Sequence, residues 1–315
     1  MTGYQALRDH CAWIDLSSRG KIRATGEDRV RFLHAMSTNH VQQLTPGTGC
    51  YAFLLNAQGR ILADANIYCF EDHFLLDTEP ETRHTVVEHL DKYIIADDVT
   101  LEDVTATLPS LSLEGPRSAE ILASLGAPLP ATPLAWAPWE RCVVAAAGIT
   151  GSAAFSIFFP ADERDSLRAS LAHAGVVEAA ADEVRLVRME NGRARYGEDF
   201  SDAHIPHETQ LFHAVHFNKG CYLGQEIVER VRSRGLVHRL LVRIAIDGAE
   251  PPPSGAEVTA EGASVGRISS AVYSPAGGKV LAFAFLRREA VDSPRPLQVG
   301  DASAELIGAQ PLAPA

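Results

Sequence analysis

One cysteine stands between two glycines in the stretch NKGCYLGQEIV, Asn218–Val228, and a lysine precedes it by two residues. A thiol reacts as its thiolate, which a neighbouring ammonium or a run of free backbone N–H groups favours. Lys219 could supply the ammonium, and Gly220 and Gly224 could leave such N–H groups free. We therefore interpret Cys221 as a candidate reactive thiol with Lys219 as its partner. A buried cysteine that packs as a small apolar side chain would explain the same residues, and this alternative stays open.

Two lone acidic residues, Asp64 and Glu190, fall on predicted regular elements. The stretch CYAFLLNAQGRILADANIYCF predicts two strands around a turn from Asn56 to Gly59, and Asp64 then lies on the second strand. The stretch ADEVRLVRMENG predicts a helix that Gly192 ends, which puts Glu190 on its last turn. Taken singly, each carboxylate is explained by default as a surface acid or a cap partner.

Four of the chain's twelve histidines are concentrated in the stretch HIPHETQLFHAVHF. Zinc and iron take imidazole, carboxylate and thiolate ligands, so this stretch with Glu208 and Cys221 could form a metal site. Pro206 interrupts the first H-x2-H pair, however, and the residues after it favour a helix with histidines on its surface. We favour the solvated helix and assign no metal ligand. The four histidines are His204, His207, His213 and His216.

Three arginines, Arg230, Arg232 and Arg234, follow the cysteine stretch at alternate positions. On a strand they would share one face, which could hold a phosphate, a polyglutamate tail or RNA. Exposed charge on a linker is the simpler interpretation, and we favour it.

The composition is that of an ordinary globular protein. Apolar residues make up 46% and charged residues 22% of the 315 residues, and no run of about 18 apolar residues could span a bilayer. The first residues contain no apolar core of a signal peptide, so we expect a cytoplasmic protein without a membrane partner. The formal net charge of −12 repels polyanions, so direct nucleic-acid binding is not predicted. Five widely spaced cysteines without a CxxC pair argue against a disulfide framework or a zinc ribbon.

Helices and strands are intermingled over most of the chain, which predicts an α+β fold. A proline-rich connection, APLPATPLAWAPW, could subdivide this part near residues 127–140. After Arg239, runs such as RLLVRIAI and KVLAFAFL are strand-like, with Pro and Gly between them and no helical period. We therefore predict a body over residues 1–238 and an all-β domain, a barrel or a sandwich, over residues 239–315.

Four stretches, in order and over nearly the whole chain, resemble the folate-binding YgfZ family, which is related to the aminomethyltransferase T-protein of the glycine cleavage system. They are DRVRFLHAMSTNHVQQLTPGTGCYAFLLNAQGRILAD, VRMENGRARYGEDF, IPHETQLFHAVHFNKGCYLGQEIVERV and VGRISSAVYS. The most specific piece is KGCYLGQE, because T-proteins typically have no cysteine in the matching segment. Around Cys221, its motif residues are Gly220, Tyr222, Gly224, Gln225 and Glu226.

The resemblance implies a pseudo-symmetric α+β body around a folate channel, a C-terminal β-barrel, and tetrahydrofolate or a derivative as cofactor. Glu190 matches the acid of the family's R-x-E-x-G segment, here Arg188–Gly192, and a carboxylate suits the two parallel donors of a pterin ring. Asp64 matches the second acid of the T-protein's G-G-x-x-D-D segment, which lies near folate N5. This sequence has Ala63 at the first acid and Arg60 at the second glycine, a departure that weighs against aminomethyl transfer.

The resemblance also implies a role in the assembly or repair of iron–sulfur proteins, including those that modify tRNA. Folate, and iron–sulfur proteins or their assembly machinery, would be the partners. A cluster takes about four thiolates, so Cys221 would share a cluster contact with a partner or carry a transient adduct. The alternative is a folate-dependent aminomethyltransferase or another one-carbon transferase that uses Asp64 and Glu190. A third possibility is an interaction module with a vestigial pocket, and whether the protein is an enzyme stays open.

Overall fold

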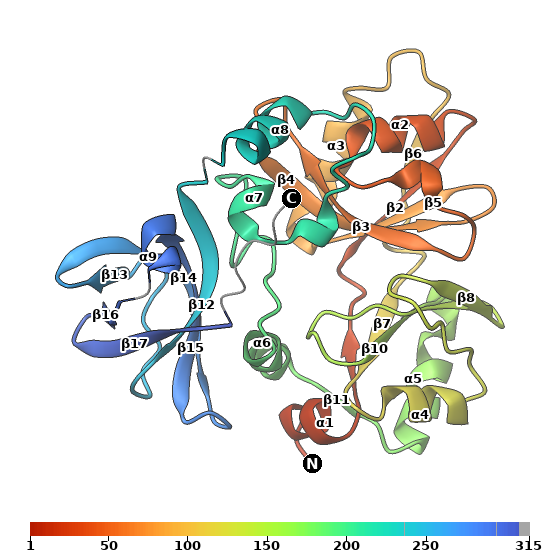
Figure 1. Ribbon diagram of the computed structural model, residues 1–315. Coiled ribbons are helices and arrows are strands. Elements are labelled where there is room, and N and C mark those ends of the chain that lie inside the picture. Colours follow the sequence, from red (N-terminus) through yellow and green to blue (C-terminus); the bar gives the residue numbers. More distant parts are fainter. Residues whose placement is uncertain (236, 294, 309–315) are drawn as a thin grey trace. The chain divides into compact units, whose positions relative to one another are not determined.

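The computed structural model describes residues 1–235, 237–293 and 295–308 (Figure 1). The chain divides into two compact units, and each unit is built from segments that are distant in the sequence. The cysteine stretch is shared between them, with Lys219 and Cys221 in the first unit and Gly224 in the second. The first unit comprises Met1–Leu55, Leu62–Val187 and His213–Leu223, and the second comprises Asn56–Ile61, Arg188–Phe212 and Gly224–Ala315.

The first unit contains a five-stranded sheet in the order β3-β4-β5-β2-β6. Helices α2 and α3 bury apolar side chains in one cluster with this sheet, among them Leu33 of α2 and Leu90 of α3. Each such burial stabilises the fold by about 2 kcal/mol. The bounds are β2 (Gly20–Thr25), α2 (Arg29–Met36), β3 (Gly49–Leu55), β4 (Ile61–Cys69), β5 (Phe74–Thr78), α3 (Arg83–Asp91) and β6 (Thr100–Asp103).

A second sheet of the first unit has six strands in the order β11-β1-β7-β10-β9-β8. Helices α4 and α5 pack on it through a separate apolar cluster, which includes Leu122 of α4 and Leu171 of α5. The bounds are β1 (Ala12–Asp15), β7 (Ser110–Glu114), α4 (Ser118–Ser124), β8 (Trp136–Trp139), β9 (Cys142–Ala145), β10 (Ala154–Phe158), α5 (Arg164–His173) and β11 (Val177–Glu178).

The two sheets repeat one pattern of strands and helices. The series β2-α2-β3-β4-β5-α3 corresponds to β7-α4-β8-β9-β10-α5, and the four strands of each series neighbour one another in the same order. At the same point of each series a glycine with left-handed φ joins strand to helix, Gly26 at 103° and Gly115 at 124°. A Cβ atom on Gly26 would lie 2.0 Å from the carbonyl oxygen of Asp98, so no larger residue fits there. The predicted pseudo-symmetric α+β body is confirmed.

The second unit contains a closed barrel with the strand order β12-β15-β14-β13-β16-β17, all paired antiparallel. Its interior holds apolar side chains such as Ile244 and Leu286. Closure leaves no open sheet edge. The predicted C-terminal β-barrel is therefore confirmed, and the sandwich alternative is wrong. The bounds are β12 (Arg239–Ile246), β13 (Glu257–Ala260), β14 (Ala263–Ser274), β15 (Lys279–Arg287), α9 (Arg288–Asp292), β16 (Leu297–Val299) and β17 (Ala302–Ile307).

The domain limits predicted from the sequence stay predictions. They comprise a boundary at residue 238 and a possible subdivision near residues 127–140. Residues 294 and 309–315 of the predicted C-terminal domain lie outside the described residues.

None of the helices described is long and apolar enough to span a bilayer. The remaining helical elements are α1 (Gly3–Asp9), η1 (Val41–Gln43), η2 (Pro80–Thr82), η3 (Ala161–Glu163), α6 (Ala181–Glu190), α7 (Pro206–Thr209), η4 (Phe212–Ala214) and α8 (Gln225–Arg234).

Two interpretations of charged stretches were wrong. Arg230, Arg232 and Arg234 lie on helix α8, neither on a strand nor in a linker. Because each residue of a helix turns by about 100°, Arg232 points away from Arg230 and Arg234, and the three do not share one face. The histidine stretch forms only the short elements α7 and η4, and His207 is buried instead of lying at the surface of a longer helix.

Candidate functional site

Asp64 is a buried carboxylate on β4, as the predicted hairpin places it. The hydroxyl of Tyr51 donates a hydrogen bond of 2.7 Å to its Oδ2 atom. Its Oδ1 atom is buried and has no hydrogen-bond partner among the described residues. Burial and then the charge of Glu79 raise the pKa of Asp64 to about 6, against the lowering by the Tyr51 hydrogen bond and Arg19. A buried oxygen with unused bonding capacity suits a polar ligand, because leaving it unpaired costs about 1–3 kcal/mol.

Tyr51 is a site residue that the sequence reasoning missed. It lies on β3, which neighbours β4, and its ring stacks on His213 with centroids 5.3 Å apart and planes at 25°. The predicted hairpin already paired these two strands. A partner for Asp64 could therefore have been sought among the polar side chains of the strand before it.

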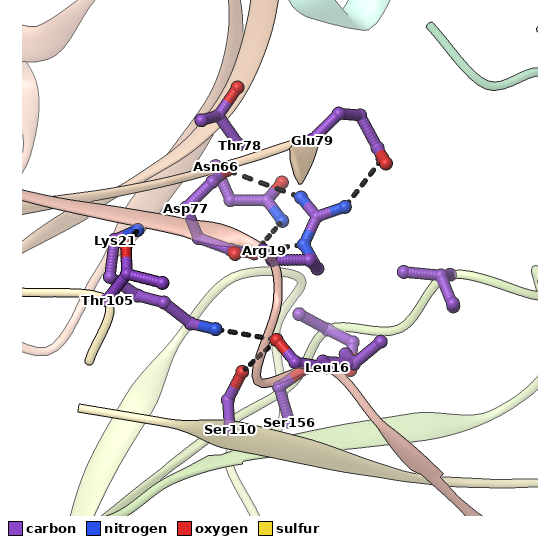
Figure 2. Close-up of polar contacts among 12 residues, drawn as sticks. Leu16, Arg19, Lys21, Asn66, Asp77, Thr78, Glu79, Thr105, Ser110 and Ser156 are labelled. Atoms are coloured by element: carbon purple, nitrogen blue, oxygen red, sulfur yellow. Dashed lines mark hydrogen bonds and ion pairs between the residues drawn. The ribbon is translucent and has the colours of Figure 1, made fainter. Parts of the chain in front are cut away.

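Close to Asp64, Arg19 directly precedes β2 and lies between two carboxylates. Its Nε atom donates to Asp77 at 2.9 Å and its NH1 atom donates to Glu79 at 2.5 Å, as Figure 2 shows. Burial alone lowers the pKa of Arg19, but the two facing carboxylates raise it well above its ordinary value. Nearby, Lys21 is fully buried and donates to the carbonyl oxygen of Leu16 at 2.6 Å, and burial lowers its pKa to about 8. No motif pointed to these residues.

Cys221 is exposed, in contrast to the other cysteines of the chain, which are buried or half-buried. Exposure argues against the alternative that Cys221 only packs as an apolar side chain. Burial raises the pKa of Cys11 and of Cys50 to about 12, so these thiols hold their protons firmly at neutral pH. Cys221 is thus the cysteine that a partner or a reagent can reach.

Lys219 points inward, although it stands two residues from Cys221. Its ammonium donates to the carbonyl oxygens of His34, of Ser37 at 2.5 Å and of Asn39 at 2.9 Å. An ammonium has three donors, so these carbonyls use all of them. Burial lowers the pKa of Lys219 to about 7. The side chain therefore anchors the loop, and its influence on the thiol of Cys221 stays a prediction.

Backbone hydrogen bonds tie the same loop, residues 213–223, to the end of α2 and to the turn after it. The N–H group of His216 donates to the carbonyl oxygen of Thr38 at 2.9 Å, and the N–H group of Leu223 donates to that of Ala35 at 3.0 Å. The hydroxyl of Thr38 in turn donates to the carbonyl oxygen of Ala214 at 2.6 Å. Cys221 consequently stands on a loop that is held on both sides of it.

The predicted cluster of four histidines is divided between the two units. His204 and His207 belong to the second unit, where His204 stacks on Phe285 with centroids 3.9 Å apart. In the first unit, His216 instead packs on His40. Among the described residues, no group of three or more His, Cys, Asp or Glu side chains could hold a metal ion. The metal alternative gains no support from this geometry.

Glu190 belongs to the second unit and ends helix α6, as the sequence predicts. Its Oε1 atom accepts a hydrogen bond of 2.5 Å from the hydroxyl of Ser274, on barrel strand β14. Arg243, on β12, donates to the carbonyl oxygens of Met189 at 3.2 Å and of Glu190 at 2.7 Å. Two barrel residues thus hold the helix end and its carboxylate, and neither was identified from the sequence.

The R-x-E-x-G motif has a structural explanation on either side of Glu190. Arg188 is buried and pairs with Asp199 at 2.5 Å and with Glu198 at 2.7 Å, which fixes the last turn of the helix. Gly192 has a φ of 71°, and a Cβ atom on it would lie 2.6 Å from the NH1 atom of Arg243. The arginine therefore stabilises the helix end, and the glycine makes room for the residue that caps it.

The motif residues after Cys221 begin helix α8. Tyr222 is buried, with the Lys219 ammonium 4.9 Å from its ring centroid. Gly224 precedes the helix with a φ of 83°, a left-handed conformation that glycine adopts without strain. Gln225 and Glu226 form the first helical residues, where an acid is favoured by the helix dipole. At Gly220, by contrast, a Cβ atom would meet nothing closer than His34 Nε2 at 4.0 Å.

Comparison with known families agrees with this architecture over both units. Residues 2–219 match the GCVT N-terminal domain, and residues 239–312 match the glycine cleavage T-protein C-terminal barrel domain. The chain belongs to the GCVT family. The finer assignment to the YgfZ group rests on the KGCYLGQE stretch and stays a prediction.

Relatives of this GCVT-family chain are distant in sequence. A chloroplastic Arabidopsis thaliana protein named "Putative transferase" is 24% identical, with 95% of this chain and 70% of that protein covered. The aminomethyltransferase of Streptomyces coelicolor is 28% identical, with 89% and 79% covered. The crystal structure of glycine cleavage system aminomethyltransferase T from Bartonella henselae has a TM-score of 0.88 at 21% identity, covering 99% of this chain and 88% of that chain. The last comparison shows that the fold is shared.

Proposed function

We propose that this protein binds a reduced folate, tetrahydrofolate or a derivative, through Asp64 and Glu190. Support comes from the GCVT family membership and from the Oδ1 atom of Asp64, a buried oxygen without a hydrogen-bond partner in the part of the chain that the structure describes. Glu190 would pair with the parallel donors of the pterin ring. Its bond from Ser274 holds the carboxylate in one orientation, which reduces the entropy lost on binding.

We further propose that Cys221 acts in the assembly or repair of iron–sulfur proteins, including enzymes that modify tRNA. The observation that carries this proposal is that Cys221 is the exposed cysteine of the chain and stands on an anchored loop. A cluster takes about four thiolates, so Cys221 would share a cluster contact with a client protein or its assembly machinery, or carry a transient adduct. A cytoplasmic location also stays a prediction.

The second candidate is a folate-dependent aminomethyltransferase or another one-carbon transferase, with Cys221 incidental. The names of the relatives and a carboxyl whose pKa of about 6 suits proton transfer favour it. Ala63, fully buried where T-proteins have the first acid, weighs against it because no second carboxylate stands at that position.

Complementation of cells that lack the gene tests the thiol. Cys221→Ser is expected to fail to restore iron–sulfur enzyme activities while binding folate normally, whereas Cys142→Ser, which changes a half-buried thiol, is expected to restore them. Full restoration by Cys221→Ser would refute the role of the thiol. A one-carbon product formed by the Cys221→Ser protein would favour the transferase.

Calorimetry with tetrahydrofolate tests the pocket. Losing a charge-assisted paired contact in Glu190→Ala is expected to cost about 1.5–3 kcal/mol, or roughly ten- to more than a hundredfold in affinity. Glu178→Ala, a matched change of an exposed acid, is expected to bind as the wild type does. No binding of any reduced folate by the wild-type protein would remove the folate hypothesis.

A further inference from the structure

Asp64 lies near a second carboxylate, Glu79, where the pairing of two strands ends. Strands β4 and β5 pair antiparallel with Ala65 opposite Thr78 and Asn66 opposite Asp77. Asp64 directly precedes Ala65 on β4, and Glu79 directly follows Thr78 just beyond the end of β5. The hydroxyl of Thr78 donates to the carbonyl oxygen of Asp64 at 2.6 Å and holds the two strands together at this point.

Glu79 is held by a guanidinium that is itself fixed. Arg19 spans Glu79 and Asp77 in the geometry that Figure 2 shows, and it also donates to the carbonyl oxygen of Asp77 at 3.4 Å. The three side chains are only 7–12% exposed, so water screens their charges weakly. An opposite charge at this distance favours the ionised form of Glu79.

We propose that Glu79, kept ionised by Arg19, is a positioning residue that sets the protonation state of Asp64. Two neighbouring carboxylates do not both ionise easily, and when one is held ionised the other takes the proton. The inference rests on the proposed function, because it concerns the carboxyl that would meet the folate. It adds two residues, Arg19 and Glu79, that no motif marks.

The proton of a neutral Asp64 belongs on its Oδ1 atom. Oδ2 already accepts the hydrogen bond from Tyr51, whereas Oδ1 accepts none from residues 1–235, 237–293 and 295–308. The charged and titratable groups around the carboxyl shift the pKa of Asp64 in opposite directions. Burial and Glu79 raise the pKa of Asp64, and Tyr51 and Arg19 lower it, with about 6 as the result. Below this pH, Asp64 donates a hydrogen bond to a ligand, and above it Asp64 accepts one.

Carbon-detected NMR titration of protein labelled at the aspartate carboxyl carbon tests the inference without any ligand. The Asp64 signal is assigned as the one absent from Asp64→Asn. Glu79→Gln is expected to lower the titration midpoint of Asp64 by about one unit, because it removes a like charge and leaves Arg19 less neutralised. Glu81→Gln makes the same chemical change at an exposed residue nearby and is expected to leave the midpoint unchanged.

Glu79→Asp keeps the charge but moves it away by one methylene, so its midpoint is expected to lie between those of the wild type and Glu79→Gln. If Glu79→Gln does not fold, Glu79→Asp alone tests the inference, which then requires a titration midpoint of Asp64 below that of the wild type. A midpoint that is the same in the wild type and in both Glu79 variants would overturn the proposal.

The pH profile of tetrahydrofolate binding separates this inference from the proposed function. If the inference and the proposed function both hold, the folate affinity of the wild type changes near pH 6. In Glu79→Gln this change moves to lower pH together with the NMR midpoint of Asp64. An NMR shift without any folate binding would refute the folate site and leave the control of Asp64 by Glu79 standing. Folate binding whose inflection stays in place, with an unmoved NMR midpoint, would refute the inference alone.

Discussion

The ammonium of Lys219 donates a hydrogen bond of 2.5 Å to the carbonyl oxygen of Ser37. Ser37 directly follows helix α2, whose last carbonyl groups have no partner inside the helix and need donors from elsewhere. Lys219 supplies donors to His34 and Asn39 as well. One side chain therefore ties the loop of Cys221 to the end of α2.

Replacing Lys219 by methionine keeps an unbranched side chain and removes all three donors. We expect the free energy of unfolding to fall by about 2 kcal/mol, because hydrogen bonds from a charged group are lost and buried carbonyls stay unpaired, although relief from burying the ammonium offsets part of the loss. Urea unfolding of Lys219→Met measures this change. Lys92→Met, at an exposed lysine, is the control, and equal stability of the two variants would argue against the anchor.

The raised pKa of Asp64 predicts a pH dependence of stability. The folded state binds this proton up to about pH 6, whereas an unfolded aspartate releases it near pH 3.9, so the contribution of Asp64 to stability falls as the pH rises through this window. Asp64→Asn removes the effect. Relative to the wild type, the variant is expected to gain about 2 kcal/mol between pH 4 and pH 7, since one unit corresponds to about 1.4 kcal/mol.

Urea unfolding at several pH values between 4 and 7 measures this gain. Asp9→Asn, at an exposed residue, serves as the control and is expected to show no comparable trend. A constant difference between Asp64→Asn and the wild type over the whole range would show that Asp64 is not a protonated acid in the folded protein.

Gly192→Ala tests the contact between the R-x-E-x-G motif and the barrel. Alanine is strained at a φ of 71°, and its Cβ atom would also meet the guanidinium of Arg243. Gly175 has a φ of 74° but open space around it, so Gly175→Ala isolates the strain. We expect Gly192→Ala to be less stable than Gly175→Ala by about 1–3 kcal/mol in thermal or urea unfolding. Equal losses would mean that Arg243 moves away at no cost.

Exposure predicts that Cys221 reacts with alkylating reagents before the other four cysteines at neutral pH. Burial raises the pKa of Cys11 and Cys50 to about 12 and that of Cys142 to about 11, which leaves little thiolate at these positions. Site-resolved mass spectrometry over time measures the order of modification. If Cys221 were the slowest in the native protein, the reactive-thiol hypothesis would fail.

The same measurement on Lys219→Met separates the two roles of the lysine. Because the carbonyl groups use all three donors, we expect the alkylation rate of Cys221 in this variant to change by less than about threefold. A tenfold slower reaction would instead support the sequence-based interpretation, in which the ammonium favours the thiolate of Cys221.

Several elements were predictable from the sequence because short-range interactions along the chain determine them. The turn at Asn56 to Gly59 is set by the residues of the turn themselves, and it placed Asp64 on the second strand of the hairpin. Gly192 likewise marked the end of the helix that carries Glu190. The arginines of α8 show the limit of such patterns, because charge at alternate positions indicates a strand only when apolar residues alternate with it.

The sequence by itself thus determined the hairpin and the helix that carry the two acids, the all-β character of the C-terminal part, and which acids and which cysteine to examine. Tertiary structure alone decided what these residues contact. Lys219 meets the carbonyl oxygen of His34, 185 residues earlier, and Ser274 meets Glu190, 84 residues earlier. Glu79 came to lie near Asp64 because β4 and β5 pair up to Ala65 and Thr78, the residues next to them. Turn and helix signals arise from neighbours along the chain, whereas burial, charge pairing and hydrogen-bond partners depend on which distant segments the fold brings together.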